Sequence, residues 1–331
     1  MNSYERVFAR LAGRPVDRVP NLCILMTFAA KYIGVTYDRY VSDYRLLVDG
    51  NLRCCEDFKI DMLSAISDPM REAHGFGANV IFPYDGVPYA SEAFIQSRSD
   101  LKKLKVKSPE SSKRMADRLE AIRLFHKKAD GQIPILGWVE GGFAEVCDLH
   151  DMSAVMTDLI QEPELINDML EICTEQAILF AQAQVAAGAD FIGIGDAAAS
   201  LIGPRLYKQF ALPYEQRIIS AIHEAGAKAK LHICGNITSI LDLTIQTGTD
   251  ILDVDWMVDF SKAVATCGAK CAVCGNFDPV AVLLQSTPEK INSAVQDCLA
   301  VSNPNTMIAA GCEVPRDTPM ENLQAVALAL K

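Results

Sequence analysis

The sequence predicts a (β/α)8 barrel, formed as one domain over residues 1–331, and this prediction depends on two observations. Short apolar runs recur along the whole chain, and segments with helical signals separate them. Each run has the length of a strand, and most runs are bounded by Gly, Pro or Asp. Strands that alternate with helices indicate parallel βα units. Because the runs number eight, a closed barrel is favoured over an open, doubly wound sheet.

The predicted strands follow one another along almost the whole chain. They span residues 19–26, 61–68, 133–140, 190–196, 229–235, 251–256, 270–276 and 307–312. The residues before position 19 are expected to form an N-terminal extension. The stretch 78–85 is typical of a hairpin or loop insertion after the second strand, and the charged stretch 97–128 of a solvated loop followed by a helix.

Prolines mark the starts of several helices between these strands. A cap residue followed by proline is a typical helix start, because the missing N–H of proline costs nothing in the first turn. The pairs are Glu162-Pro163, Asp278-Pro279, Thr287-Pro288 and Thr318-Pro319, the last completed by Glu321 as a capping box.

The charge of the chain argues against nucleic-acid and anionic-membrane partners. The formal net charge is −11 and the pI is near 5.0, whereas both kinds of partner would require a basic face. The first apolar run is shorter than the roughly 20 residues that span a bilayer, and no signal peptide is recognised, so a cytoplasmic location is expected. In that compartment the 11 cysteines are expected to be thiols rather than disulfides.

Polar residues gather at the ends of the predicted strands, where barrel enzymes keep their chemistry. Such residues also serve as structural caps, so position alone does not make them catalytic. The strand ends carry Asp68, Glu140, Asp196, His232 with Cys234, Asp253 with Asp255, Asn276 with Asp278, and Cys312.

A histidine and two cysteines in this ring indicate a metal site. In a strand, residues two apart point to one face, so His232 and Cys234 project together. Cys312 ends the eighth predicted strand at the same mouth of the barrel. One imidazole and two thiolates suit Zn2+ and leave a fourth position open, as catalytic zinc requires. The structural alternative is a core histidine with two cysteines that only fill space.

A second cysteine group has the spacing of a cluster-binding motif. Cys267, Cys271 and Cys274 match the Cys-x3-Cys-x2-Cys triad that holds iron–sulfur clusters in radical-SAM enzymes. That triad normally follows the first strand, whereas two of these cysteines lie within the seventh predicted strand. Residues three apart in a strand face opposite sides, so these cysteines are expected to be core residues.

Several motifs give the chain a resemblance to the uroporphyrinogen decarboxylase superfamily, and within it to the zinc methyltransferases that work with corrinoid proteins. The matching stretches are YERVF (4–8), GRPVDRVP (13–20), GWVEGGF (137–143), DAAAS (196–200), LPY (212–214), LHICGN (231–236), GNFDP (275–279) and GCEVP (311–315). The resemblance covers nearly the whole chain, and His-x-Cys with the later Gly-Cys is its specific signature.

The resemblance implies a zinc-dependent methyltransferase that moves a methyl group between methylcobalamin, carried as a corrinoid on a partner protein, and a thiol or similar small acceptor. It implies zinc at His232, Cys234 and Cys312. Glu140, Asp196 and Asn236 are expected to orient the substrate or accept its proton, and Met26, Asp85 and Asp255 to contact it. The fourth zinc ligand stays open, with Asp255 first and Glu140 second by position. A homodimer is compatible with these features.

Other activities fit the chain less well. A metal-independent, uroporphyrinogen decarboxylase-like lyase would carry arginines after the first strand, to grip a substrate with many carboxylates. The stretch 26–32 here contains none, and the decarboxylases have a histidine in place of Cys312. A demethylase that loads the corrinoid from a methyl donor, the reverse half of the pathway, remains an alternative, as does a catalytically silent barrel that only binds a corrinoid protein.

Overall fold

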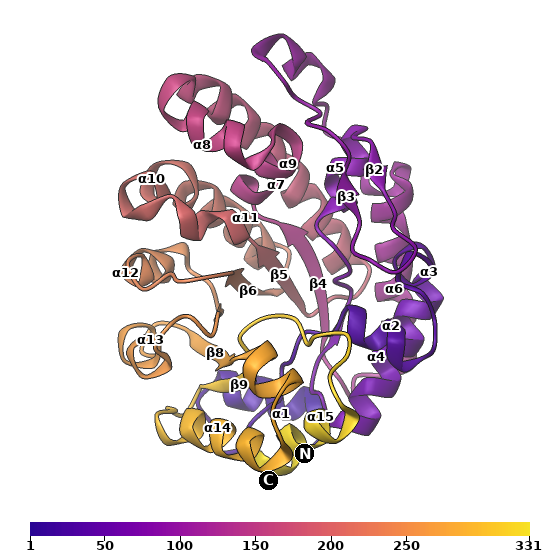
Figure 1. Ribbon diagram of the computed structural model, residues 1–331, viewed down its shortest axis with the longest axis vertical. Helices are drawn as coiled ribbons and strands as arrows, with labels where there is room; N and C mark the ends of the chain where they lie inside the picture. The colour runs from indigo at the N-terminus through magenta and orange to yellow at the C-terminus, as the bar shows by residue number, and fades with distance from the viewer.

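The computed structural model describes residues 1–331 and confirms the barrel (Figure 1). Seven parallel strands form one curled sheet in the order β1-β4-β5-β6-β7-β8-β9. They are β1 (Leu63–Ser64), β4 (Ile135–Glu140), β5 (Phe191–Gly195), β6 (Lys228–Ile233), β7 (Ile251–Val254), β8 (Ala272–Phe277) and β9 (Met307–Ala310). Each lies within, or within one residue of, a predicted strand.

The eighth position of the barrel is filled by an extended segment rather than a regular strand. The predicted strand 19–26 makes one parallel bridge, between Asn21 and Ile308. Ile308 N–H donates to Pro20 O, and Asp61 N–H donates to Asn21 O, so the segment joins β9 to the residues before β1. The ladder stays irregular because Pro20 has no N–H and the Asn21 side chain accepts from the N–H of Cys23.

Helices surround the sheet, and both termini lie at the same end of the molecule (Figure 1). The helices that follow the strands are α5 (Met70–Phe76), α7 (Gly142–His150), α8 (Met152–Gln161), α9 (Pro163–Ala186), α10 (Gly203–Phe210), α11 (Leu212–Glu224), α12 (Leu241–Thr244), α13 (Phe260–Cys267), α14 (Pro288–Ala300) and α15 (Met320–Ala329). The others are α1 (Ser3–Leu11), α2 (Thr27–Tyr32), α3 (Tyr37–Ser42), α4 (Tyr44–Phe58) and α6 (Lys113–Ala129). No helix combines the length and the hydropathy that crossing a bilayer requires.

The N-terminal extension lies against the amino ends of the strands. Tyr4 N–H in α1 donates to the carbonyl of Gln132, which precedes β4, and the ring of Phe8 lies 5.2 Å from that of Phe191 at the start of β5. Arg10 donates to the carbonyl of Thr306, before β9. Helix α1 therefore packs against the end of the barrel opposite the predicted site, where barrels keep stabilising rather than catalytic residues.

The predicted insertion is a short hairpin after α5. Strands β2 (Val80–Ile81) and β3 (Tyr89–Ala90) pair antiparallel. The stretch that follows contains two short 3-10 turns and then α6. The expectation of a solvated helix there was wrong in part, because α6 buries Arg114 and Arg118 among its apolar residues.

The predicted helix start at Asp278 is confirmed, whereas the one at Thr318 differs from the prediction. Asp278 accepts from the N–H groups of Val280 and Ala281, as expected of a cap. The capping box at Thr318 was wrong. Pro319 has extended backbone angles and is itself the cap residue, so α15 begins one residue later than predicted and the hydroxyl of Thr318 has no hydrogen-bond partner.

Candidate metal centre

The structure brings His232, Cys234 and Cys312 together at the carboxyl ends of the strands. His232 lies in β6, Cys234 is the first residue after the end of β6, and Cys312 is the second residue after the end of β9. Their three donor atoms all lie within 4.8 Å of one another, and His232 Nε2 is 3.1 Å from Cys234 Sγ. Both cysteines are partly exposed, whereas the other nine are buried. The cysteines of the motif 267–274 are among those nine, and they do not form such a group.

A glycine lies next to each of the two cysteines, and the backbone there requires it. Gly235 has a φ of +84°, which turns the chain immediately after Cys234. At Gly311, a Cβ atom would lie 2.2 Å from the backbone nitrogen of Trp256, so only glycine lets the loops after β7 and β9 approach this closely. Cys312 comes directly after that contact. The Gly311-Cys312 pair is therefore a geometric requirement as well as a motif.

A buried ion pair supports the histidine from inside the barrel. Lys230, two residues before His232 on the same face of β6, pairs with Asp253 of β7, and both side chains are 1% exposed. Oδ2 of Asp253 also lies 3.3 Å from His232 Nδ1. Carboxylates behind metal-binding histidines orient the ring and fix its tautomer. Asp253 is placed for that role on the Nδ1 side of His232, while Nε2 faces Cys234.

The charges within the cluster favour a thiolate at Cys312. Hydrogen bonding from Cys234, and then from His232, lowers the pKa of Cys312 to about 4, although burial opposes this shift. Burial alone would lower the pKa of His232, but the charge of Cys234 raises it well above its usual value. A thiolate is the form in which a cysteine binds a metal cation, so this shift at Cys312 is compatible with a metal site.

A cavity of about 160 Å³ opens beside the three ligands. Its lining is mostly apolar and includes three carboxyl side chains, those of Asp68, Glu140 and Glu313. The lining residues are Ile24, Met26, Ile66, Asp68, Pro69, Trp138, Glu140, Gly195, Ala197, His232, Cys234, Cys312 and Glu313. Of the residues predicted to contact substrate or assist catalysis, Met26 and Glu140 lie in this wall.

Glu140 is held at the cavity by a buried arginine. Arg71 of α5, which is fully buried, donates from Nη2 to Glu140 Oε1 over 2.7 Å. Burial is the largest influence on Glu140 and, with the negative charge of Glu72, outweighs Arg71 and raises the pKa of Glu140 to about 8. A carboxyl group with this pKa can exchange a proton near neutral pH.

Asp196 lies behind the wall of the cavity rather than in it. Its Oδ1 accepts from the N–H of Ala144, in the first turn of α7. Burial raises the pKa of Asp196 to about 7, and its other neighbours are Glu215 and, through Glu215, Tyr207. The predicted direct contact of Asp196 with substrate therefore stays a prediction. Asp196 holds the start of α7, next to the strand that ends in Glu140.

The other three predicted residues also make structural contacts outside the cavity lining. Asn236 is exposed and accepts from the N–H of Thr238. Asp255 accepts from the N–H groups of Gly235 and Met257, so both its oxygens are used in holding loops. Asp85 pairs with Arg316 and accepts from the N–H of Tyr37. No direct contact of these residues with a ligand in the cavity follows from their positions.

Sequence reasoning missed several residues that shape the cavity. Trp138 alternates with Glu140 along β4, and this period of two could have identified it. Asp68 ends a predicted strand but was given no role. Glu313 follows Cys312 directly, and its carboxylate accepts from the N–H and the hydroxyl of Thr27 at the start of α2. Arg71 gave no signal, because a charged residue in a helix is usually exposed.

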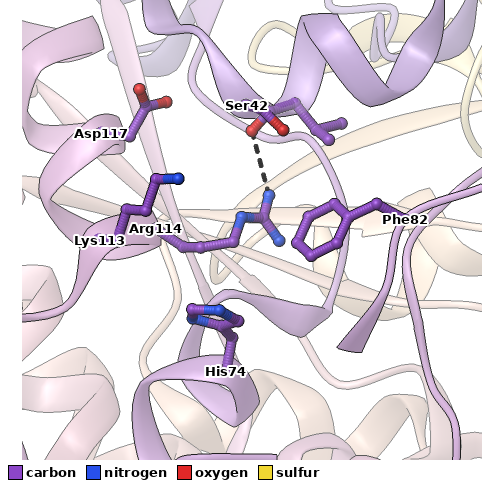
Figure 2. Close-up of a pocket in the computed structure, with 7 residues that line it drawn as sticks. Ser42, His74, Phe82, Lys113, Arg114 and Asp117 are labelled. Atoms are coloured by element: carbon purple, nitrogen blue, oxygen red, sulfur yellow. Dashed lines mark hydrogen bonds between the residues drawn. The ribbon is translucent and has the colours of Figure 1, made fainter. Parts of the chain in front are cut away.

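A second pocket, of about 200 Å³, lies behind Asp68 and contains none of the cluster residues (Figure 2). Arg114 crosses it beside the ring of Phe82, with the guanidinium carbon 5.2 Å from the ring centroid. Arg114 is already neutralised, because both its terminal nitrogens donate to Asp68. Arg114 therefore holds Asp68, which lines the cavity beside the zinc-type ligands.

The family comparison covers almost the whole chain. A sequence model described as "Uroporphyrinogen decarboxylase (URO-D)" matches residues 2–331. The chain is 29% identical over 326 residues to "Methylcobamide:CoM methyltransferase MtbA" of Methanosarcina acetivorans, with 97% of this chain and 95% of that protein covered. It is 26% identical over 292 residues to uroporphyrinogen decarboxylase of Carboxydothermus hydrogenoformans, with 84% and 80% covered.

Solved structures extend this similarity. A methyltransferase from Methanosarcina mazei superposes with a TM-score of 0.91 at 25% identity, covering 99% of this chain and 98% of that one. A B12-independent methionine synthase from Shewanella sp. W3-18-1 shares the fold, with a TM-score of 0.58, 14% identity and coverage of 86% and 87%. The comparisons support methyltransferase as the enzyme class. Matched by one family model from residue 2 to residue 331, the chain belongs to the uroporphyrinogen decarboxylase family.

Proposed function

We propose that this protein transfers a methyl group from a corrinoid, carried by a partner protein, to a small thiol at a zinc centre held by His232, Cys234 and Cys312. The observation that carries the proposal is the group of three zinc-type donors beside a cavity at the mouth of the barrel. The relatives named methylcobamide:CoM methyltransferases support a corrinoid donor and a thiol acceptor.

The three residues fit zinc by their chemistry and spacing. Zn–S bonds of about 2.3 Å and Zn–N bonds of about 2.0 Å place tetrahedral ligands about 3.5 to 3.8 Å apart. The donor atoms here lie within 4.8 Å of one another, and His232 Nε2 lies 3.1 Å from Cys234 Sγ, so small side-chain shifts reach that geometry. Three protein ligands leave the fourth position to the acceptor.

The protein's own residues would bind and shield the acceptor. Zinc, when bound, would supply Lewis acidity that keeps the acceptor sulfur ionised at neutral pH. Ile24, Met26 and Trp138 give the cavity an apolar wall, which suits the carbon chain of a small thiol and excludes water. Glu140 lies in the same wall, and with its pKa raised to about 8 it could exchange a proton with the thiol near neutral pH.

Porphyrinogen decarboxylation is the alternative from another enzyme class, and decarboxylases occur among the relatives. The cavity wall argues against it. Asp68, Glu140 and Glu313 line the cavity, and no arginine or lysine does. A substrate with many carboxylates would find no cationic partner in this lining. Transfer in the reverse direction, from a methyl donor to the corrinoid, uses the same site and differs only in which substrate binds beside the ligands.

Zinc removal is expected to abolish thiol methylation and zinc addition to restore it. Purified protein should contain one zinc per chain by mass spectrometry of the metal. With methylcobalamin and a series of thiols, including the 2-mercaptoethanesulfonate that CoM denotes, the absorbance of methylcobalamin should fall only with the metal-loaded protein.

Two results would count against the proposal. Metal-free protein that methylates thiols at the full rate would exclude the zinc centre. Carbon dioxide release from uroporphyrinogen, without any loss of methylcobalamin, would instead favour the decarboxylase alternative.

A further inference from the structure

The pocket drawn in Figure 2 lies among helices α3, α5 and α6, at the point where α6 begins. It encloses about 200 Å³ and is called the Arg114 pocket below. Its lining includes Ser42 of α3, His74 of α5, Phe82 of the hairpin, and Lys113, Arg114 and Asp117 of α6. Arg114 extends from the helix across the pocket toward the ring of Phe82 (Figure 2). None of these residues belongs to the zinc-type group or lines the cavity beside it, so the pocket needs an explanation of its own.

Lys113 leaves this pocket with one positive charge that has no partner in the lining. Arg114 is balanced, because both its terminal nitrogens donate to Asp68. Lys113 is the first residue of α6, is exposed, and makes no hydrogen bond with the residues drawn in Figure 2. The whole chain has a net charge of −11, so this local positive charge is opposite in sign to the protein as a whole. Such a pocket attracts anions.

The carboxylate in the lining does not offset that charge. Asp117 Oδ1 accepts from the N–H of Tyr44 over 3.1 Å, and Oδ2 accepts from the buried guanidinium of Arg118. Asp68, the other carboxylate near the pocket, is buried and bonded to Arg114. Both carboxylates therefore have cationic partners of their own, and the lysine remains available to an anion.

Hydrogen-bond donors without partners lie around the same pocket. Arg114 bonds only through its terminal nitrogens, to Asp68 and to the carbonyl of Val41, so its Nε–H is free. His74 Nδ1 is buried without a partner. Helix α6 is 17 residues long, and its cap residue Ser112 makes no bond to the first turn, although the hydroxyl is buried and has no partner. Because buried polar groups normally find partners, this group of free donors points to a ligand with several acceptor atoms.

These features together fit a phosphate group. Its oxygens accept several hydrogen bonds at once, and a phosphate monoester carries about 1.5 to 2 negative charges near neutral pH. Lysine side chains and helix N-termini are both common phosphate ligands. A carboxylate has fewer oxygens, and a metal cation would be repelled by Lys113. Phe82 and Val41 form an apolar side of the pocket, where the organic part of a monoester would fit.

We propose that the Arg114 pocket binds a phosphate group, from inorganic phosphate or from a phosphate monoester. Lys113 supplies the unpaired charge, and Arg114 Nε, His74 and the first turn of α6 supply hydrogen bonds. This binding site goes beyond the proposed methyl transfer and can be measured without turnover. Because Arg114 also holds Asp68, the site borders the lining of the cavity beside the zinc-type ligands.

Titration calorimetry of the full-length protein with sodium phosphate is expected to show one saturable site per chain. Lys113→Met should weaken phosphate binding about tenfold or more, because a hydrogen bond to a charged group contributes about that much. Lys113→Arg keeps the charge and should retain most of the affinity. The matched control is Lys127→Met, which removes the same charge from the exposed far end of α6 and should bind phosphate as the wild type does.

Phenyl phosphate and acetate test the class of ligand. Phenyl phosphate that binds more tightly than inorganic phosphate, and loses this advantage in Phe82→Ala, would identify a monoester as the ligand. Equal affinity for the two would identify free phosphate. In either case acetate, with fewer oxygens and less charge, should bind about tenfold more weakly or worse. Acetate that binds as tightly as phosphate would contradict the assignment.

The titration of His74 gives a second readout. Burial first, and then the positive charges of Arg114 and Lys113, lower the pKa of His74 from its usual value of 6.5, against the opposing charge of Asp68. Bound phosphate would offset those positive charges, so the pKa should rise when phosphate is added. Proton NMR of the five histidines measures this shift, with His74→Gln to assign the signal. His126, at the other end of α6, should not respond.

Two results would overturn the phosphate site. One is the absence of saturable binding to the wild-type protein at millimolar phosphate, together with an unchanged pKa of His74. The other is equal affinity in folded Lys113→Met and Lys127→Met. Neither result bears on methyl transfer, and a protein that binds phosphate here but methylates no thiol would refute only the proposed function.

Discussion

Replacing Cys234 by alanine is expected to remove the bound zinc and to lower the rate of methyl transfer by about 10³-fold or more. Lewis-acid stabilisation by a metal supplies several kcal/mol, and about 4 kcal/mol corresponds to a factor of about 10³ in rate. The sulfur of Cys234 lies 3.1 Å from His232 Nε2. Its removal would leave His232 and Cys312 as the only two of the three protein ligands that hold catalytic zinc. Metal content by mass spectrometry and loss of methylcobalamin absorbance measure the two effects.

A matched variant separates loss of the ligand from general damage to the fold. Cys298 is buried on α14, outside the metal-type group, and Cys298→Ala should keep its zinc and its rate. Circular dichroism should show both variants folded. Wild-type zinc content and rate in Cys234→Ala would refute the assignment of Cys234 as a ligand.

The barrel and the position of the ligands were predictable because both depend on local periodicity. Eight apolar runs separated by helical segments predict the fold, and the period of two in a strand places His232 and Cys234 on one face. The end of the eighth predicted strand places Cys312 at the same mouth of the barrel, and the resemblance implies that the three residues bind zinc together. The structure adds that Gly311 is required by the close approach of Trp256.

Other features depend on contacts that a local pattern does not show. Asp196 was chosen for its place at a strand end, and the structure shows its Oδ1 accepting from the N–H of Ala144 in α7, outside the cavity lining. Pro20 and the side chain of Asn21 prevent a regular first strand. The partnership of Arg71 with Glu140 joins α5 to the end of β4, residues 69 positions apart, and no local pattern reveals it.

Replacing Arg114 by methionine is expected to destabilise the protein by about 3 to 5 kcal/mol, because it leaves the buried carboxylate of Asp68 without its cation. Arg114 is 5% exposed and Asp68 is fully buried, and the two join through hydrogen bonds of 2.7 and 2.6 Å. Asp68 also caps α5 by accepting from the N–H of Met70. Urea unfolding followed by circular dichroism at neutral pH measures the change in the free energy of unfolding.

Two control variants test whether the unpaired charge of Asp68 causes the loss of stability. Arg98→Met breaks an ion pair between side chains that are 55% and 48% exposed, and should change stability by less than about 1 kcal/mol. The double variant Asp68→Asn with Arg114→Met removes both buried charges, so it should recover much of the loss. A double variant as unstable as Arg114→Met alone would show that packing of the long side chain, rather than the unpaired charge, is what Arg114 contributes.

The pH dependence of Arg114→Met has a definite sign. Burial alone would raise the pKa of Asp68, but Arg114 holds it well below its usual range in the wild-type protein. The folded protein therefore gains stability from the ionised carboxylate above the unfolded pKa of about 3.9, and loses that gain as the pH falls toward the folded pKa. In Arg114→Met the buried Asp68 lacks its cation, so its folded pKa should lie above 3.9 and protonation should relieve the unpaired charge. The difference in unfolding free energy between wild type and variant should therefore be largest at neutral pH and shrink toward pH 4. A difference that stays constant over this range would contradict the electrostatic origin of the effect.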